Sequence, residues 1–318
     1  MAARQVDQQT RNAPIVTPPS AVDPRRIVVK LGTNVIMRPD GRVALGLLCS
    51  LVESIAALRE LGHEILVVSS GSIGLGIERL GLASRPTDLA QIQACAAVGQ
   101  SRLMSIYDDA FDRLGCRIAQ VLLTEDDFRD PTRHANLRRT LHALLSLGVI
   151  PIVNENDTVS TLELDRPAES LERYGTPSQE LSPELSPGLS QGRIFGDNDK
   201  LSALLMTHID ADLLVLLSDV DGLFDRSPNT PGAKLIPVVP AITEQIRAHA
   251  QGGNGRGRGG MASKLEAARI VTAAGRTAVI ANGRTQQVLE HICGDRAKGQ
   301  ESIGTTFLPA HNVVGEAL

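Results

Sequence analysis

The alternation of short apolar runs with helical segments constrains this 318-residue chain more than any other feature. Runs rich in Val, Ile and Leu, such as residues 26–31, 64–69 and 149–153, each end in a glycine or a polar cluster and lead toward a longer segment with helical spacing. Strands that are buried on both faces have this composition, and helical crossovers make such strands parallel. The pattern predicts an α/β fold, with roughly seven or eight strands in a mainly parallel sheet and helices on both faces.

The individual elements follow from the same pattern. Strands are expected at residues 26–31, 64–69, 117–123, 149–153, 212–219, 277–281 and 304–308, with a short hairpin arm at 234–239. Helices are expected at residues 45–61, 89–114, 131–147, 201–209, 261–274 and 288–292. Glycines at positions 62, 115 and 148 end three of these helices.

Polar residues follow four of the expected strands at the point where each strand ends. These clusters lie at residues 32–34, 69–71, 154–157 and 218–219. Right-handed crossovers place the carboxyl ends of parallel strands at one edge of the sheet, where open α/β proteins bind their ligands. The sequence therefore predicts that the four clusters converge on one site.

The composition excludes several classes of function. A net charge of −4 and an aromatic content of 2% provide neither a general attraction to nucleic acid or anionic lipid nor stacking platforms for bases. No apolar run approaches the roughly 20 residues that a membrane span needs. Cys49, Cys95, Cys116 and Cys293 form no C-x-x-C pair, which is typical of reduced thiols in a cytoplasmic protein. No H-E-x-x-H or similar spacing predicts a metal bound by the protein alone.

Charged residues near the predicted site suggest phosphate chemistry. Lys30 ends an apolar strand, Lys264 lies one turn into a helix after a glycine loop, and Gly196-Asp197-Asn198-Asp199 begins another helix. Two cations near an acidic helix start suit phosphoryl transfer, where catalysis is mainly positioning and electrostatic stabilisation. The alternatives are a strand-end lysine that reaches solvent, a solvated helix lysine and an ordinary acidic cap. Asp197 could serve as a cap, as a ligand contact or as both.

Two segments have other readings. The arginine–glycine stretch 252–260 resembles segments that bind RNA, although it holds only two arginines in an acidic chain. Residues 160–193 carry four prolines and a repeated Leu-Ser-Pro phrase, which predicts a flexible surface insertion or a lid.

Several motifs together resemble the amino-acid kinase family. The match runs from about residue 26 to residue 308, and its most specific motifs are Asn154-Glu155-Asn156-Asp157 and Gly196-Asp197-Asn198-Asp199. The other motifs that carry it are Val28-Val29-Lys30-Leu31-Gly32, Ser69-Ser70-Gly71-Ser72-Ile73, Ala97-Val98-Gly99-Gln100-Ser101-Arg102-Leu103, Leu217-Ser218-Asp219-Val220-Asp221-Gly222-Leu223 and Gly259-Gly260-Met261-Ala262-Ser263-Lys264. Within the family the two paired acidic motifs resemble the branch that acts on glutamate.

The resemblance implies a three-layer αβα sandwich around a sheet of about eight strands. It also implies transfer of the ATP γ-phosphoryl group to the side-chain carboxylate of L-glutamate, the first step of proline biosynthesis. The alternative is another acceptor used in the family, such as acetylglutamate, aspartate or UMP. A ligand-binding sensor that has lost catalysis is disfavoured because both lysines and Asp199 are present.

The resemblance assigns roles to individual residues. Lys30, Asp199 and Lys264 would be catalytic, with Asp199 as the counter-ion that orients the two lysines. Glutamate would be bound by Ser70, Asn154, Asp157 and Asn198. ATP would be bound by Lys30, Ser218, Asp219, Arg258, Gly259, Gly260, Met261, Ala262, Ser263 and Lys264. Mg²⁺ would bridge the phosphates of ATP.

The resemblance also concerns partners and the domain plan, and this sequence departs from the family at some positions. It implies homo-oligomers and feedback inhibition by proline, whereas the composition predicts a cytoplasmic location and no nucleic-acid or membrane partner. The expected plan is a disordered tail at residues 1–25 and a kinase domain at 26–318, without the C-terminal RNA-binding-type (PUA) domain of many relatives. Arg258 stands where relatives carry a small hydroxyl residue, and the 160–193 segment is longer than is usual between the two acidic motifs.

Overall fold

The computed structural model of the chain describes residues 26–159, 198–251, 260–294 and 303–310. The tail predicted at residues 1–25 and the insertion predicted at 160–193 lie outside these ranges.

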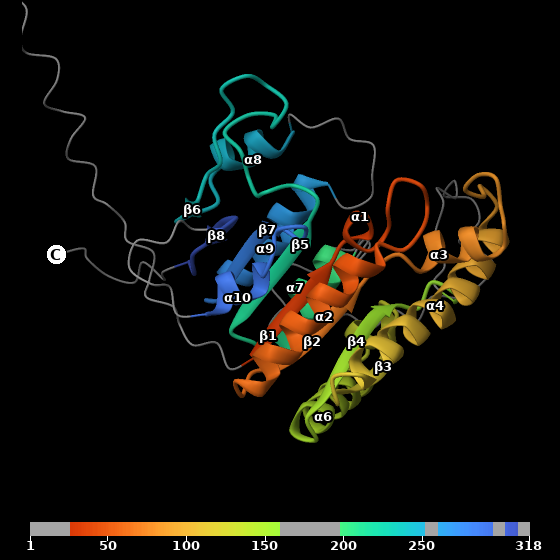
Figure 1. Cartoon of the computed structure of the whole chain (residues 1–318). Coiled ribbons are helices and arrows are strands. Elements are labelled where there is room, and N and C mark those ends of the chain that lie inside the picture. Colours follow the sequence, from red (N-terminus) through yellow and green to blue (C-terminus); the bar gives the residue numbers. More distant parts are fainter. Residues whose placement is uncertain (1–25, 160–197, 252–259, 295–302, 311–318) are drawn as a thin grey trace, which may run out of the picture.

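One sheet of eight strands organises the described part of the chain (Figure 1). Its strands are β1 (Arg26–Leu31), β2 (Glu64–Ser69), β3 (Arg117–Leu123), β4 (Val149–Glu155), β5 (Leu213–Ser218), β6 (Val238–Val239), β7 (Thr277–Asn282) and β8 (Thr305–Phe307). Their spatial order is β3-β4-β2-β1-β5-β7-β8-β6. All neighbouring pairs are parallel except β7 and β8, which are antiparallel. The predicted mainly parallel sheet is confirmed.

Helices cover both faces of this sheet, which makes three layers. The helices are α1 (Thr33–Ile36), α2 (Leu45–Glu60), α3 (Ser72–Arg79), α4 (Leu89–Asp112), α5 (Asp126–Arg129), α6 (Pro131–Ser146), α7 (Asn198–His208), α8 (Glu244–Gln251), α9 (Met261–Ala273) and α10 (Val288–Cys293). Apolar residues of α2, α4 and α10 form one core against the sheet, and those of α6, α7 and α9 form a second core on the other face. The predicted αβα sandwich is therefore confirmed.

Alternation along the strands decides which layer each site residue faces. In β1, Val28 belongs to the core under α7 and α9, whereas Val29 belongs to the core under α2 and α4. Lys30 shares the face of Val28 because successive side chains of a strand point to opposite sides. In β4 the same rule places Asn154 on the face of α4. The candidate site therefore receives side chains from both layers.

Two stretches fold differently from the simplest reading of their sequence. Residues 70–76 carry three glycines and read as a turn, but only Gly71 is in the left-handed region, with φ of 98°, and α3 begins directly after it. The predicted hairpin arm at 234–239 is reduced to a single antiparallel bridge between Phe224 and Leu235, and its end forms β6 beside β8.

The described residues contain three buried cysteines and one that is half-buried, Cys49, and none of the four is in a disulfide. Within the same ranges, each helix is too short or too polar to cross a bilayer.

Candidate functional site

A buried carboxylate between two buried lysines forms the centre of the candidate site. Asp199 Oδ1 lies 2.6 Å from Lys30 Nζ, and Asp199 Oδ2 lies 3.0 Å from Lys264 Nζ. The three residues come from the first turn of α7, the end of β1 and the first turns of α9. Asp199 is 0% exposed, Lys30 5% and Lys264 4%, so all three charges are shielded from solvent.

The electrostatics of this trio keep Asp199 ionised. Burial by itself would raise the pKa of the Asp199 carboxyl, but the neighbouring Lys30 and Lys264 outweigh burial and leave the pKa below its usual value. One carboxylate thus balances two ammonium groups, and the trio keeps one unit of positive charge. A buried net positive charge attracts an anionic group such as a phosphate.

A cluster of amides and hydroxyls lies next to this trio. Asn198 Nδ2 is 2.9 Å from each of three acceptors, Ser69 O, Ser70 Oγ and Asn154 Oδ1. Asn154 Nδ2 in turn lies 3.4 Å from Ser72 Oγ, which is 3.5 Å from Asp157 Oδ2. The structure therefore brings together all four residues that the sequence predicts for the amino acid, namely Ser70, Asn154, Asp157 and Asn198.

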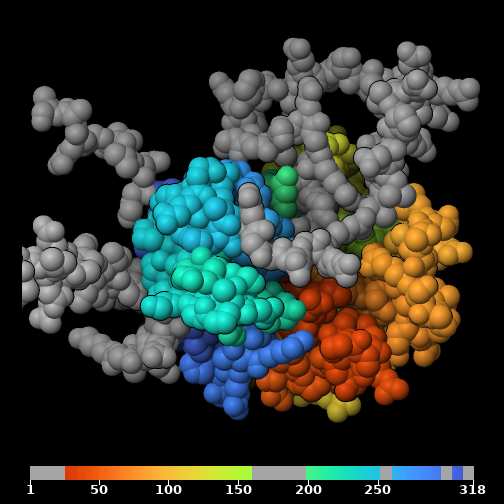
Figure 2. Space-filling model, turned by 90° about the horizontal axis from the view of Figure 1, so that it is seen from above, coloured from red at the N-terminus to blue at the C-terminus, as the bar shows by residue number. Residues whose placement is uncertain are grey.

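The next strands along the same edge hold the residues predicted for the nucleotide. Ser218 ends β5, and its Oγ lies 3.2 Å from Asp219 Oδ1. Asp219 Oδ2 accepts a 2.9 Å hydrogen bond from Asn34 Nδ2. Arg284, which follows β7, donates to the carbonyl oxygen of Asn34. In Figure 2 the segments around residues 34, 220 and 284, coloured red, cyan-green and blue, lie side by side on one face of the molecule.

Gly32 keeps space open beside the lysine of β1. A Cβ at this position would lie 3.8 Å from Lys30 Nζ and 3.2 Å from the carbonyl oxygen of Leu217. The φ of Gly32 is −72°, which any residue can adopt, so Gly32 matters here because it has no side chain. A phosphate can approach this backbone closely.

The start of α9 supplies the rest of the predicted nucleotide loop. Gly260 is the N-cap of this helix, and Met261, Ala262 and Ser263 form its first turn ahead of Lys264. Their backbone N–H groups lie at the positive end of the helix dipole, where an anion is stabilised. Arg258 and Gly259 lie outside the described residues, as do Gly196 and Asp197.

The structure adds residues that the sequence analysis did not select. Asn34 and Ser72 contact selected residues. Asn34 stands in the polar cluster at residues 32–34 and Ser72 in a quoted motif, so their polarity beside a strand end was the available signal. Gln100 lies on α4, 54 positions before Asn154 in the sequence, and its Oε1 accepts a 2.9 Å hydrogen bond from Asn154 Nδ2. Tyr107 is fully buried and shares a 2.9 Å hydrogen bond with Ser69 Oγ, and burial raises the pKa of its hydroxyl.

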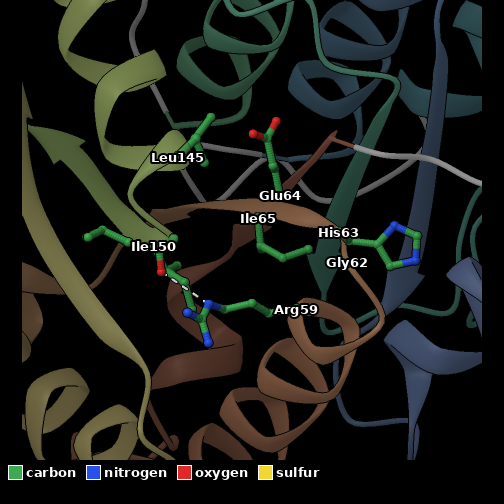
Figure 3. A pocket seen from close by; sticks show the side chains of 9 residues that line it. Arg59, Gly62, His63, Glu64, Ile65, Leu145 and Ile150 are labelled. Atoms are coloured by element: carbon green, nitrogen blue, oxygen red, sulfur yellow. Dashed lines mark hydrogen bonds between the residues drawn. The ribbon is translucent and has the colours of Figure 1, made fainter.

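A cavity of about 320 Å³ lies elsewhere, at the edge of the sheet where β2 and β4 begin (Figure 3). Arg59, His63 and Glu64 line it together with apolar residues such as Ile65 and Leu145. Arg59 donates to the carbonyl oxygen of Gly148, and the Arg59, His63 and Glu64 side chains point in different directions in Figure 3. Polar groups that converge on one point define a ligand site, so this cavity is not the candidate site.

The chain belongs to the amino acid kinase family, whose model matches residues 25–282. Among its curated relatives are glutamate 5-kinases. The protein from Synechococcus sp. (strain JA-2-3B'a(2-13)) is 45% identical over 288 residues, which are 89% of this chain and 68% of the relative. The protein from Methanosarcina mazei is 39% identical over 302 residues, which are 92% of this chain and 70% of the relative.

Solved structures show the same fold at greater distance. An isopentenyl phosphate kinase from T. acidophilum matches with a TM-score of 0.54 and 18% identity, over 89% of this chain and 99% of that protein. A UMP kinase from Bacillus anthracis matches with a TM-score of 0.54 and 14% identity, over 90% of this chain and 97% of that protein. At these identities the likeness concerns the fold alone.

Proposed function

We propose that this protein transfers the γ-phosphoryl group of ATP to the side-chain carboxylate of L-glutamate, which is the first step of proline biosynthesis. The observation that carries the proposal is the buried trio of Lys30, Asp199 and Lys264 beside the amide cluster at Asn154 and Asn198. The glutamate 5-kinases that are 39–45% identical to this chain support glutamate as the acceptor.

The two halves of the site divide the substrates between them. In the sheet, β1 lies between β2, which leads to the amide cluster, and β5, which leads to Ser218 and Asp219. We assign glutamate to the side of β2 and β4, and ATP to the side of β5 and the start of α9. Lys30 lies between the two sides, where the phosphoryl group moves from one substrate to the other.

The proposed reaction joins a side-chain carboxylate oxygen of glutamate to the γ-phosphorus of ATP while the bond from that phosphorus to the bridging oxygen of ADP breaks. The product is an acyl phosphate. A glutamate side chain has an ordinary pKa of about 4.3, so it is ionised at neutral pH and the reaction needs no general base. Lys30 and Lys264 stabilise the charge that develops on the transferred group, and Asp199 holds both ammonium groups in place.

Magnesium suits this site only in partnership with the nucleotide. The described residues contain no group of three or more His, Cys, Asp or Glu side chains that could hold a metal. Mg²⁺ commonly uses one or two carboxylates together with phosphates and water, and Asp219 is an exposed carboxylate on the nucleotide side. We propose that Asp219 faces an Mg²⁺ ion carried by ATP, which would neutralise phosphate charge.

Three further predictions from the family belong to the proposal. They are inhibition by proline, assembly into homo-oligomers and a cytoplasmic location. Each has its own measurement, namely proline titration of the activity, sedimentation of the purified protein and fractionation of cells that express it.

The acceptor is tested by trapping the acyl phosphate with hydroxylamine. The protein is incubated with MgATP and, separately, with glutamate, aspartate, acetylglutamate or UMP, and both hydroxamate and ADP are measured. We expect hydroxamate and equimolar ADP with glutamate, and loss of both when EDTA removes the magnesium. Turnover of acetylglutamate or UMP with none of glutamate would overturn the proposal.

A further inference from the structure

Three amide side chains form a continuous hydrogen-bonded chain at the acceptor side of the site. Asn198 Nδ2 donates to Asn154 Oδ1 over 2.9 Å, and Asn154 Nδ2 donates to Gln100 Oε1 over 2.9 Å. We call Gln100, Asn154 and Asn198 the amide chain. It runs from the first turn of α7, past the end of β4, to the middle of α4.

The direction of the amide chain is fixed by the backbone. Asn198 Nδ2 lies 2.9 Å from the carbonyl oxygen of Ser69, which can only accept a hydrogen bond, so this atom must be the nitrogen. The Asn154 atom facing it must then be the oxygen, and the Gln100 atom facing Asn154 Nδ2 must be Oε1. The exchange of N and O that is possible for an isolated amide is therefore excluded here.

The two ends of the amide chain are left without partners. Gln100 Nε2 and Asn198 Oδ1 are both shielded from solvent, and neither has a hydrogen-bond partner among the described residues. Gln100 as a whole is only 8% exposed. Because an unpaired buried polar group costs about 1–3 kcal/mol, such a group in a folded protein calls for an explanation.

The two ends of the amide chain offer different hydrogen-bonding chemistry. The Gln100 end offers an N–H donor, which suits a carboxylate, and the Asn198 end offers an acceptor, which suits an ammonium group. The amide chain crosses β4, and β4 lies two strands away from β1 and Lys30. Two strand spacings are roughly 10 Å, so a substrate whose reacting carboxylate meets Lys30 has its other end near the amide chain.

We propose that Gln100 Nε2 binds the α-carboxylate of the amino-acid substrate and thereby contributes to the choice of acceptor. This inference rests on the proposed function, because it places the reacting carboxylate at Lys30. Gln100 distinguishes an acceptor that carries a carboxylate at its non-reacting end from one that carries only an amine there.

The competing role for Gln100 is to hold the amide of Asn154 in place. Two substitutions separate the roles. Gln100→Met removes both the donor and the acceptor at similar size, whereas Gln100→Glu retains an acceptor for Asn154 Nδ2 but removes the donor and adds a negative charge. If Gln100 only positions Asn154, the Gln100→Glu variant binds the substrate almost normally. If Gln100 binds the substrate carboxylate, the Gln100→Glu variant does not.

The experiment measures KM for glutamate and inhibition constants for two partial substrates, 4-aminobutyrate, which lacks the α-carboxylate, and glutarate, which lacks the amine. Gln91→Met is the matched control, since Gln91 is an exposed glutamine of the same helix. We expect Gln100→Met to raise KM for glutamate and the inhibition constant of glutarate by at least tenfold. The inhibition constant of 4-aminobutyrate should change by less than twofold, and KM for ATP should not change. Gln100→Glu should raise KM for glutamate by the same factor or more.

Each outcome decides the assignment. Equal weakening of all three ligands by Gln100→Met, or near-normal glutamate binding by Gln100→Glu, would show that Gln100 only positions Asn154. A parent protein that does not phosphorylate glutamate would refute the proposed function instead. Circular dichroism and the melting temperature of each variant identify any loss of fold.

Discussion

At the scale of single residues, the outstanding feature is a carboxylate with no exposed surface that serves two ammonium groups at once. Asp199 contacts Lys30 through one oxygen and Lys264 through the other. Removing one partner of a buried ion pair costs about 3–5 kcal/mol because the remaining charge is left uncompensated. Here two charges would be left, and both belong to the residues that we assign to the phosphoryl group.

The first prediction concerns this residue. Asp199→Asn should lower kcat by at least 100-fold and lower the free energy of unfolding by about 3 kcal/mol or more, because Lys30 and Lys264 lose their common counter-ion. Activity assays and urea unfolding measure the two effects.

The matched control is Asp210→Asn, which removes an acid from a surface ion pair with Arg138 whose side chains are 59% and 52% exposed. Surface pairs contribute about 0–1 kcal/mol, so this variant should keep its activity and nearly all its stability. An Asp199→Asn protein with full activity would refute the role of Asp199.

Sequence reasoning found the residues of the site but not which of them would be buried. Lys30 was recognisable because a lysine at the end of an apolar strand is uncommon on a surface, whereas Lys264 alone reads as a solvated helix residue. Only the packing of α7 against α9 buries it, and no local pattern contains that information. Gln100 lies inside a motif of the family resemblance but received no role, since its partner is far along the chain.

At the scale of elements, α3 and α4 pack against each other with their backbones in close contact. A Cβ on Gly76 would lie 1.8 Å from the carbonyl oxygen of Cys95, and a Cβ on Gly99 would lie 1.7 Å from that of Ser72. The two backbones can approach so closely only because each helix has a glycine, which has no Cβ, at its point of contact. This contact also fixes Ser72 and Gln100, which touch the amide of Asn154.

The second prediction follows from this contact. Gly99→Ala should force α3 and α4 apart and raise KM for glutamate. It should also lower the free energy of unfolding by about 1–3 kcal/mol or more, which is the usual cost of overpacking. Denaturant unfolding and steady-state kinetics measure these effects.

Gly46→Ala is the control, because Gly46 is an exposed glycine inside α2 with no atom within 4 Å of a Cβ. Alanine there should stabilise the protein by about 0.5–1 kcal/mol. Equal effects of the two substitutions would contradict the close helix contact.

The third prediction concerns the contact of α6 with α7. His208 packs edge-on against His134 and Phe128, and its Nδ1 lies 2.6 Å from the carbonyl oxygen of Leu204. Burial, followed by the neighbouring His134, lowers the pKa of His208 to about 4; the hydrogen bond with the Leu204 carbonyl opposes this shift, Arg138 adds to it, and Asp210 opposes it. The folded protein therefore keeps this ring neutral at pH values where the unfolded chain is protonated.

The sign of the pH dependence follows directly. Between about pH 6.5 and pH 4 the unfolded state binds the proton and the folded state does not, so stability falls as the pH falls. From pH 7 to pH 5 this amounts to roughly 2 kcal/mol. His208→Asn retains a donor for Leu204 and should lose less stability over this interval, as measured by urea unfolding at both pH values. An unchanged difference would exclude His208 as its source.

The elements themselves were largely predictable because they follow from apolar periodicity. The strands of the sheet and the long helices were expected close to their observed bounds, whereas α3 was read as a glycine turn. Three glycines in seven residues favour a turn locally, and the close packing on α4 overrides that preference. Tertiary contact also explains the reduced hairpin arm, since its last residues pair with β8.

At the scale of the whole molecule, the parallel sheet sets the distance between the two proposed substrate sides. Asp157 follows β4 and Asp219 follows β5, and the order β4-β2-β1-β5 separates the two strands by three spacings, roughly 14 Å. The convergence of polar clusters on one edge was predictable from topology. Their proposed division into an acceptor side and a nucleotide side came from the family resemblance alone, because the order of strands in space is not contained in any local pattern.

This separation leads to the last prediction. Asp157→Asn should raise KM for glutamate by about tenfold or more and leave KM for ATP within twofold, since an acid that binds the substrate ammonium acts on one side only. Asp219→Asn should do the reverse. Sites more than about 7–10 Å apart with no shared partner act additively to within about 0.3–0.5 kcal/mol. The double variant should therefore lose kcat/KM by the product of the two single losses, within a factor of about two. A strongly non-additive result, or a change in the KM of the other substrate, would mean that the two sides are coupled through the lysines and Asp199 between them.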